Sequence, residues 1–84
     1  MTTVLQKVDE ELRKIGLELG EIVADHYSRK PHIRKLAIIS CRITELVTLV
    51  VSAAQSGDIS GGEARKRING LLTANQTIKL YIEV

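Results

Sequence analysis

The chain has no Phe and no Trp, only two Tyr, and a single Pro, Cys and Met among its 84 residues. Without large aromatic rings, we expect a core of aliphatic side chains that interdigitate between helices. The lone Cys41 cannot form an internal disulfide and has no His or Cys at metal-ligand spacing, which excludes disulfide scaffolds and zinc modules. We expect Cys41 to serve as a small buried apolar side chain.

The size and the N-terminus limit the architecture further. A chain of this length forms one small domain, residues 1–84, that buries only a modest fraction of its surface when it folds alone. The N-terminal segment becomes charged and amphipathic at once, without the apolar stretch of a signal peptide, so we expect synthesis in the cytoplasm.

Charge is unevenly distributed, although the net charge is only +2. Residues 1–28 carry six acids and three bases, whereas residues 29–84 carry nine bases and four acids. An acidic first segment therefore precedes a basic remainder, which points to an anionic partner for the second part.

Residues 36–54 form the most apolar segment, with Arg42 and Glu45 as its only charged side chains. A helix that is hydrophobic nearly all round belongs inside a packed assembly or in a membrane. Arg42 and Glu45 argue against a single span in lipid but could pair with each other. We therefore expect a membrane to be an unlikely partner and self-association to be the main one.

The first segment has apolar residues at alternating steps of three and four, which is a coiled-coil pattern and predicts a helix over residues 3–28. Gly16 and Gly20 lie four residues apart on its flank. Each costs about 1 kcal/mol relative to Ala in a helix interior. They indicate either a close contact with another helix or a tolerated weak spot.

Pro31 marks the break before a second helix, predicted over residues 32–56, and Gly57 is the expected stop signal. Ser60 and Glu63 have the spacing of a capping box, so a short third helix or a turn is expected over residues 61–74. Asn69 and Gly70 could instead form a hairpin turn.

The C-terminal residues 77–84 alternate apolar and polar side chains, which favours an extended segment. The alternative is that the third helix continues, because Ile68, Leu72, Ile78 and Ile82 also fit a helical face. The predicted fold is thus mainly α, an antiparallel hairpin of two long helices with a short third element and an extended tail.

We find no motif for catalysis or for a cofactor. Glu18, Glu21 and Asp25 share a face of the first helix, but a magnesium site of this kind needs a second acidic set, and the second helix offers only Glu45. No catalytic triad, phosphate-binding loop or metal-ligand pair is present. We therefore predict a protein that is not an enzyme and has no cofactor and no metal.

Two basic runs could neutralise phosphates without reading bases. Because no aromatic side chain accompanies them, duplex DNA backbone is a better target than single-stranded bases. The alternative is a solvated surface that keeps the protein soluble. The predicted nucleic-acid-binding residues are Arg29, Lys30, Arg34, Lys35, Arg65, Lys66 and Arg67.

The apolar faces of the two long helices are the predicted self-assembly surface. Many copies packed side by side would cover the apolar surface of the second helix and would give the extended tail a pairing partner. The residues expected to take part are Leu5, Val8, Leu12, Ile15, Gly16, Leu19, Gly20, Ile22, Leu36, Ile39, Ile43, Leu46, Val47 and Val50.

The size, the apolar seam of residues 5–22, the apolar second helix and the basic runs at 29–35 and 65–67 resemble the small helical-hairpin major virion proteins of rod-shaped archaeal DNA viruses. The resemblance is one of build and carries over no functional residue. It implies a coat that assembles around double-stranded DNA, located in the virion or the cytoplasm. The alternatives are a small oligomeric DNA-binding or adaptor regulator, including a helix-turn-helix interpretation of residues 51–70, and a membrane-embedded helical protein.

Overall fold

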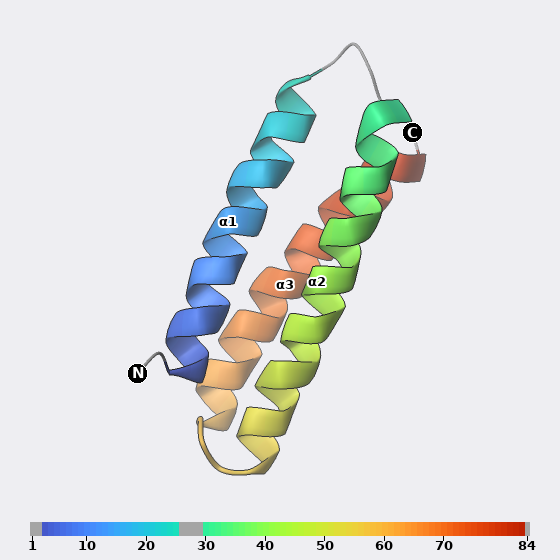
Figure 1. Ribbon diagram of the computed structural model, residues 1–84. Helices are drawn as coiled ribbons and strands as arrows, with labels where there is room; N and C mark the ends of the chain where they lie inside the picture. Colours follow the sequence, from blue (N-terminus) through green and yellow to red (C-terminus); the bar gives the residue numbers. More distant parts are fainter. Residues whose placement is uncertain (1–2, 26–29, 84) are drawn as a thin grey trace.

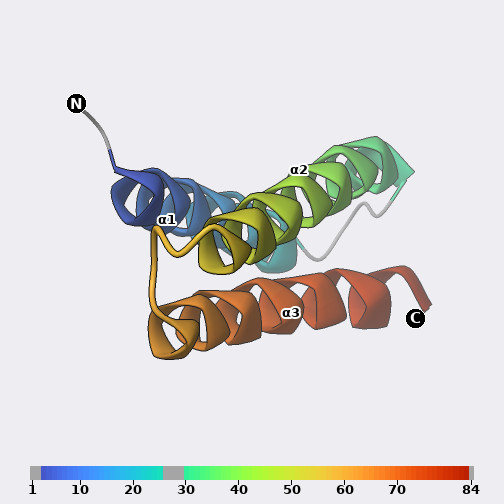
Figure 2. The ribbon, with the colours of Figure 1, turned by 90° about the horizontal axis from the view of Figure 1, so that it is seen from below.

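The computed structural model describes residues 3–25 and 30–83, with side chains described over residues 3–25 and 32–81. They form three helices: α1 (Val4–Ala24), α2 (Lys30–Gln55) and α3 (Gly61–Glu83). The helices run up, down and up, so that α1 and α3 point the same way (Figure 1). Each helix contacts the other two, and α3 packs across α1 and α2 when the bundle is seen from below (Figure 2). The bundle is elongated, 45 × 25 × 17 Å.

The start of α1 is determined by a capping box. Thr3 Oγ1 accepts a hydrogen bond from the Gln6 backbone N–H at 3.1 Å, and the Gln6 side chain accepts one from the Thr3 N–H at 3.0 Å. This reciprocal pair satisfies two of the backbone donors that a helix start leaves free. The helix ends at Ala24 with Asp25 as its C-cap. The predicted end at residue 28 was therefore too late within the described residues, and residues 26–28 lie outside them.

The turn between α2 and α3 follows the expected signals. Gly57 has a φ of +84°, which glycine adopts without the steric cost of a Cβ. Its N–H donates to the Ala54 carbonyl, and the Asp58 N–H donates to the Ala53 carbonyl, which together make a Schellman motif. Ser60 Oγ then accepts from the Glu63 N–H at 3.2 Å and caps α3. The Glu63 carboxylate, which the predicted capping box directs at the Ser60 N–H, instead accepts a hydrogen bond from Arg67.

One aliphatic core runs the length of the bundle and draws on all three helices. Buried positions recur at steps of three and four in α2 and at steps of seven, four and three in α1, as an amphipathic helix requires. The seam of α1 packs against its own chain. The buried apolar residues are Val8, Ile15, Leu19, Ile22, Leu36, Ile39, Ile43, Leu46, Val50, Ala53, Ala64, Leu71 and Ile78.

The expected hairpin with an extended tail is wrong in its C-terminal third. The third helix continues from Gly61 to Glu83, through both the Asn69–Gly70 pair and the tail. Leu71 and Ile78 are buried one heptad apart, whereas Leu80 is 60% exposed. A strand would have placed Ile78 and Leu80 on the same face. A helix forms here because its apolar residues, which recur with the helical period of 3.6 residues, can pack against the apolar surfaces of α1 and α2.

Cys41 also differs from its expectation. The thiol is free and the residue is exposed on the outer face of α2. The core-facing positions of that helix are taken by larger aliphatic side chains such as Ile39 and Ile43.

Candidate interaction surfaces

Arg42 lies in the apolar helix α2 but reaches across to α1. Its guanidinium donates to Glu18 Oε2 at 2.6 Å and to Glu11 Oε2 at 3.2 Å. The hydrogen bond to Glu18 raises the pKa of Arg42 above its ordinary value, and the bond to Glu11 adds to the effect against partial desolvation. The pairing of Arg42 with Glu45 was considered as a possibility, and the structure instead pairs Arg42 with Glu11 and Glu18 of α1, which connects the two helices.

A hollow of about 430 Å³ lies between α1 and α2, lined by Glu18, Glu21, Asp25, His32 and Arg42 among others. The three carboxylates are those considered for magnesium. Glu18 is bound by Arg42, and Asp25 Oδ2 lies 2.8 Å from His32 Nε2. Two of the three carboxylates therefore already have a partner within the chain, a guanidinium for Glu18 and an imidazole for Asp25. Within the described residues, no group of three His, Cys, Asp or Glu side chains could hold a metal ion.

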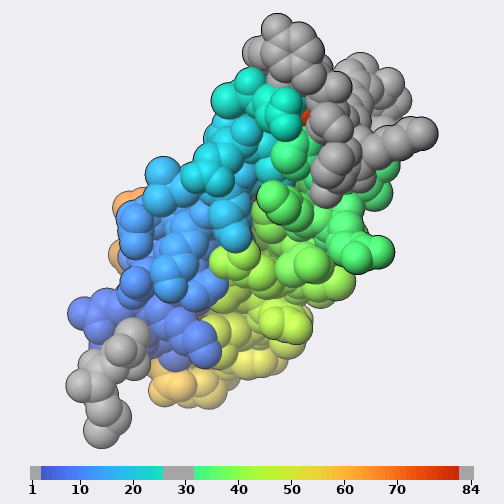
Figure 3. All heavy atoms as spheres, turned by 45° about the horizontal axis from the view of Figure 1, so that its top comes forward, coloured from blue at the N-terminus to red at the C-terminus, as the bar shows by residue number. Residues whose placement is uncertain are grey.

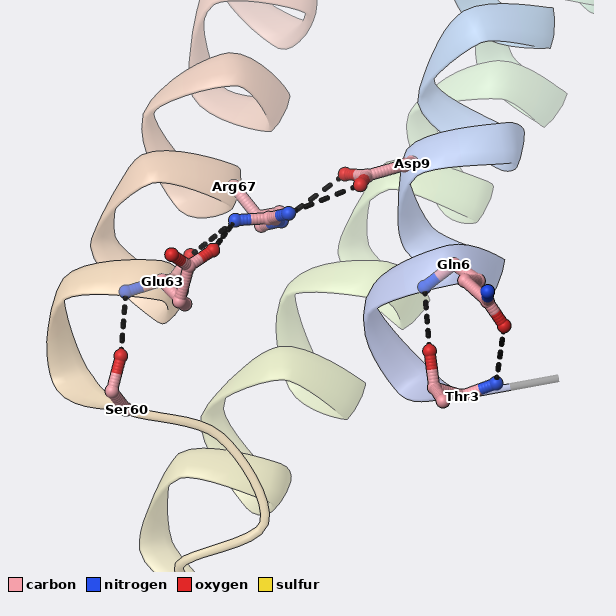
Figure 4. Close-up of polar contacts among 6 residues, drawn as sticks. All are labelled: Thr3, Gln6, Asp9, Ser60, Glu63 and Arg67. Carbon is pink, nitrogen blue, oxygen red and sulfur yellow. Dashed lines mark hydrogen bonds and ion pairs between the residues drawn. The ribbon is translucent and has the colours of Figure 1, made fainter.

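Arg67 connects α3 to α1 (Figure 4). Its Nε and Nη2 atoms donate to the two carboxylate oxygens of Asp9 at 3.1 and 3.0 Å, and Nη1 donates to Glu63. The hydrogen bond to Asp9 is the main reason that the pKa of Arg67 is raised. Only 12% of the side chain is exposed. Arg67 is engaged within the bundle and is not available to a phosphate without breaking this fork.

The other predicted basic residues fall into two separate groups. Arg34 and Lys35 are exposed near the start of α2, and Arg65 and Lys66 are exposed near the start of α3. These starts lie at opposite ends of the bundle (Figure 1). Among residues that the structure describes, no carboxylate forms an ion pair with these four. Arg29 lies outside the described residues, as does the side chain of Lys30.

Most of the predicted self-assembly residues are covered within one copy. Nine of them are buried in the core, Leu12 and Val47 pack partly against it, and Leu5 is half-buried. Helix α3 supplies much of the cover that the sequence pattern had assigned to other copies. Self-assembly through these positions stays a prediction, and Gly16 and Gly20 are the two that lie exposed.

A shallow apolar groove runs between α1 and α3. Its volume is about 650 Å³. A Cβ built on Gly16 or Gly20 would meet nothing within 4 Å, whereas one on Gly70 would lie 3.0 Å from Leu12 Cδ2. Gly70 therefore allows α3 to approach α1, but the single chain makes no use of the space above Gly16 and Gly20. The lining residues are Leu12, Gly16, Leu19, Gly20, Val23, Asn69, Gly70, Thr73, Ala74 and Thr77.

Large aliphatic side chains remain exposed on every helix. On α1 they flank the exposed glycines: Leu17 is 59% exposed and Val23 is 43% exposed. The space-filling view shows α1 and α2 side by side on one face, with α3 reaching the surface only at its edges (Figure 3). Among residues 3–25 and 32–81, the exposed large aliphatic residues are Leu17, Val23, Ile33, Ile38, Val51, Leu72 and Leu80.

Sequence reasoning missed two connections that close the bundle. The Tyr81 hydroxyl lies 3.2 Å from the Ile22 carbonyl oxygen and 3.3 Å from the Asp25 carbonyl oxygen, and its single proton is shared between these two acceptors, which ties the end of α3 to the end of α1. The Arg67 fork with Asp9 does the same near the other end. The Tyr81 contact was hidden by the alternating pattern of the tail, and the Arg67 contact joins residues 58 positions apart, which no local pattern contains.

Among the residues that the structure describes, one helical segment, His32–Gln55, is long and apolar enough to cross a membrane, with a mean hydropathy of 1.8. The core helix of a soluble bundle has the same character, so this feature does not decide between the two. Comparison with family models, with curated proteins and with solved structures found no match.

Proposed function

We propose that the protein is a non-enzymatic structural protein that self-assembles, and that the assembly is a coat or packaging layer on double-stranded DNA. The observation that carries the proposal is the surface of the single copy. It exposes 5920 Å², against about 5000 Å² expected for a folded monomer of this mass. The excess of about 900 Å² is close to the ~800 Å² that one partner contributes to a standard protein interface.

The shape of the bundle explains where this surface comes from. The radius of gyration is 13.8 Å, whereas a compact domain of 84 residues would have about 12 Å. Long helical faces can pack side by side, and the exposed large aliphatic residues in the described part of the chain are distributed over all three helices. Lateral packing of copies would remove the excess surface from water.

The DNA part of the proposal is supported by Arg34, Lys35, Arg65 and Lys66, which are exposed at the two ends of the bundle. Arg67 is left out of this set because Asp9 and Glu63 hold it. Positive charge at both ends would let neighbouring copies contact phosphates at regular intervals, with affinity that comes from counterion release and not from base contacts.

The test is sedimentation velocity of the purified protein over a wide range of concentrations, with and without linear duplex DNA, followed by electron microscopy. We expect concentration-dependent growth into particles or filaments, with DNA promoting it. A discrete dimer or tetramer would favour the alternative of a small regulator or adaptor. A monomer at all concentrations would refute the proposal, and extraction only with detergent would favour the membrane alternative.

A further inference from the structure

The outer side of α2 carries an uncharged stripe that the single copy leaves exposed. Only 33% of the most apolar window of this helix is buried, so the other two helices cover a minority of it. Residues that recur at steps of three and four share one face of a helix. The α2 stripe consists of Ile33, Ala37, Cys41, Thr44, Thr48 and Val51, all of them exposed.

The two charges at the centre of α2 lie on its other side, toward α1. Arg42 is bound by Glu11 and Glu18 of α1, and Glu45 lines a small hollow together with Lys7 of α1. These charges oppose a helix that crosses a bilayer with lipid all round it. They lie off the α2 stripe, which can therefore contact an apolar phase while Arg42 and Glu45 stay outside it.

The hydroxyl groups on the α2 stripe are satisfied within the helix. Thr44 Oγ1 donates to the Ser40 carbonyl at 3.1 Å, and Thr48 Oγ1 donates to the Thr44 carbonyl at 3.1 Å. A hydroxyl that leaves water without a partner costs free energy, and bonding to the carbonyl four residues before removes that cost. The α2 stripe can therefore leave water without stranding a hydroxyl donor.

Helix α3 lies beside α2 (Figures 1 and 2) and adds two cations and a leucine. Ser40 donates to Asn75 Oδ1, which marks the sides on which the two helices meet. Leu72 lies three residues before Asn75, Lys79 lies four residues after it, and Arg65 lies one heptad before Leu72, so all three share that side of α3. Each of the three is exposed. They and the α2 stripe together form what we call the α2/α3 face.

We propose that the α2/α3 face docks on an anionic lipid surface, with its apolar residues among the acyl chains and its cations at the lipid phosphates. Among residues 32–81, neither the α2 stripe nor the α3 row contains a carboxylate, so the charge on the face has one sign. Apolar side chains flanked by Lys and Arg are typical of helices that lie in the membrane interface. The cations are attracted by the negative potential of anionic lipids. This inference goes beyond the proposed coat and does not depend on it.

A second copy and duplex DNA fit the α2/α3 face less well. Two copies paired through it would bring cations together without a carboxylate to neutralise them. Duplex DNA would attract Arg65 and Lys79 through its phosphates but offers no apolar phase to Ile33, Val51 and Leu72. Arg65 also belongs to the group proposed for DNA, whereas Lys79 and the α2 stripe belong to the lipid contact alone.

The first experiment measures co-sedimentation of the full chain with vesicles of phosphatidylcholine containing phosphatidylglycerol. Ile33→Ser/Leu72→Ser should weaken binding at least about tenfold, because both residues lose apolar area that lipid would cover. The matched control is Leu17→Ser/Val23→Ser, which changes two exposed aliphatic residues of α1 and should bind like the wild type. Circular dichroism of each variant shows whether it has folded.

The second experiment removes the cations. Arg65→Gln/Lys79→Gln should weaken binding to the same vesicles about 25-fold, since each cation near an anionic surface contributes about a factor of five. Lys7→Gln/Arg13→Gln removes the same charge from exposed positions of α1 and should bind like the wild type. Vesicles of pure phosphatidylcholine should bind all these proteins weakly.

The third experiment uses Cys41, the only cysteine of the chain, which lies on the α2 stripe and is exposed. A nitrobenzoxadiazole label on Cys41 should shift its emission to shorter wavelength when anionic vesicles are added, because it enters an apolar surrounding. The same label on a Leu17→Cys/Cys41→Ser protein reports from α1 and should not shift.

The outcomes decide between the occupants of the face. Absence of binding to anionic vesicles would overturn the proposal, and equal losses in the α1 controls would show that the α2/α3 face has no special role. If Ile33→Ser/Leu72→Ser alters self-association in sedimentation velocity but leaves vesicle binding unchanged, the occupant is a second copy and the lipid contact is refuted. Assembly with and without DNA is measured in the absence of lipid, so the proposed function stands or falls separately.

Discussion

At the residue scale, the most apolar helix of the chain contains a charged side chain, Arg42, whose partners lie on the neighbouring helix. Arg42 is 28% exposed and is hydrogen-bonded to two carboxylates of α1. A charge buried without partners would cost far more than its pair contributes. The ion pairs therefore favour the rotation of α2 that turns Arg42 toward the carboxylates of α1.

Replacing this arginine should have a modest, measurable effect. Glu11 and Glu18 are 30% and 47% exposed, so solvent screens the pair and we expect Arg42→Met to lower the free energy of unfolding by about 1 kcal/mol. The measurement is urea denaturation followed by circular dichroism. Lys14→Met is the control, because Lys14 also faces Glu11 but within one helix and at 3.7 Å. An equal loss in both variants would contradict an inter-helix role for Arg42.

The raised pKa of Arg42 also determines how the difference in unfolding free energy between the wild type and Arg42→Met depends on pH. A base whose pKa is raised by folding contributes stability that is fully present below its unfolded pKa and is lost only as the pH rises through the folded value. The difference between wild type and Arg42→Met should therefore stay constant between about pH 7 and pH 10.

At the scale of elements, α3 decides the fold, and its C-terminal half was the part that the sequence pattern misjudged. The test compares two aliphatic residues of that half. Ile78 is 3% exposed and Leu80 is 60% exposed. We expect Ile78→Ala to lower the free energy of unfolding by about 2–4 kcal/mol and Leu80→Ala to change it by less than about 0.5 kcal/mol.

These two variants have the same chemistry in the same helix, so each controls for the other. A strand would make the two losses similar, since both side chains would lie on one face. Equal effects in thermal or urea denaturation would therefore refute the helical register of the tail.

The predictability of each element depended on how many signals agreed. In α1 and α2, the three-four spacing of Val8, Ile15, Ile39 and Ile43 had one interpretation, and both helices were confirmed. The stop at Gly57 was confirmed because its conformation is local. The tail was wrong because alternation and helical spacing were both present, and only the partner surfaces of α1 and α2 could choose between them.

Surfaces were harder to predict than elements. The seam of α1 and the apolar face of α2 were correctly identified as apolar faces that must be covered, but α3 of the same chain covers most of them. Part of its contribution, including the buried Ile78, was missed because residues 77–84 were expected to be extended. The basic runs were located, yet the engagement of Arg67 by Asp9 depends on a contact between residues 58 positions apart, which no local pattern contains.

At the scale of the whole molecule, the two ends of the bundle carry separate positive groups. The hydrogen bond between Ser40 and Asn75 sets the register of α2 against α3. From that register, the group of Arg34 and Lys35 lies roughly 22 Å along the bundle from the group of Arg65 and Lys66, at 1.5 Å per residue. The two groups must contact different phosphates if both bind DNA.

Each group should therefore contribute its own part of the salt dependence of DNA binding. If Arg65 and Lys66 each neutralise one phosphate, Arg65→Gln/Lys66→Gln should reduce the slope of log K against log salt by about 1.8, since each phosphate contributes about 0.9. The control Lys7→Gln/Lys14→Gln removes the same charge from the acidic helix α1 and should leave the slope unchanged. A fluorescence anisotropy titration on duplex DNA at several salt concentrations measures both. An equal decrease in the two variants would mean that net charge alone drives retention, and the end of α3 would then have no specific role in holding DNA.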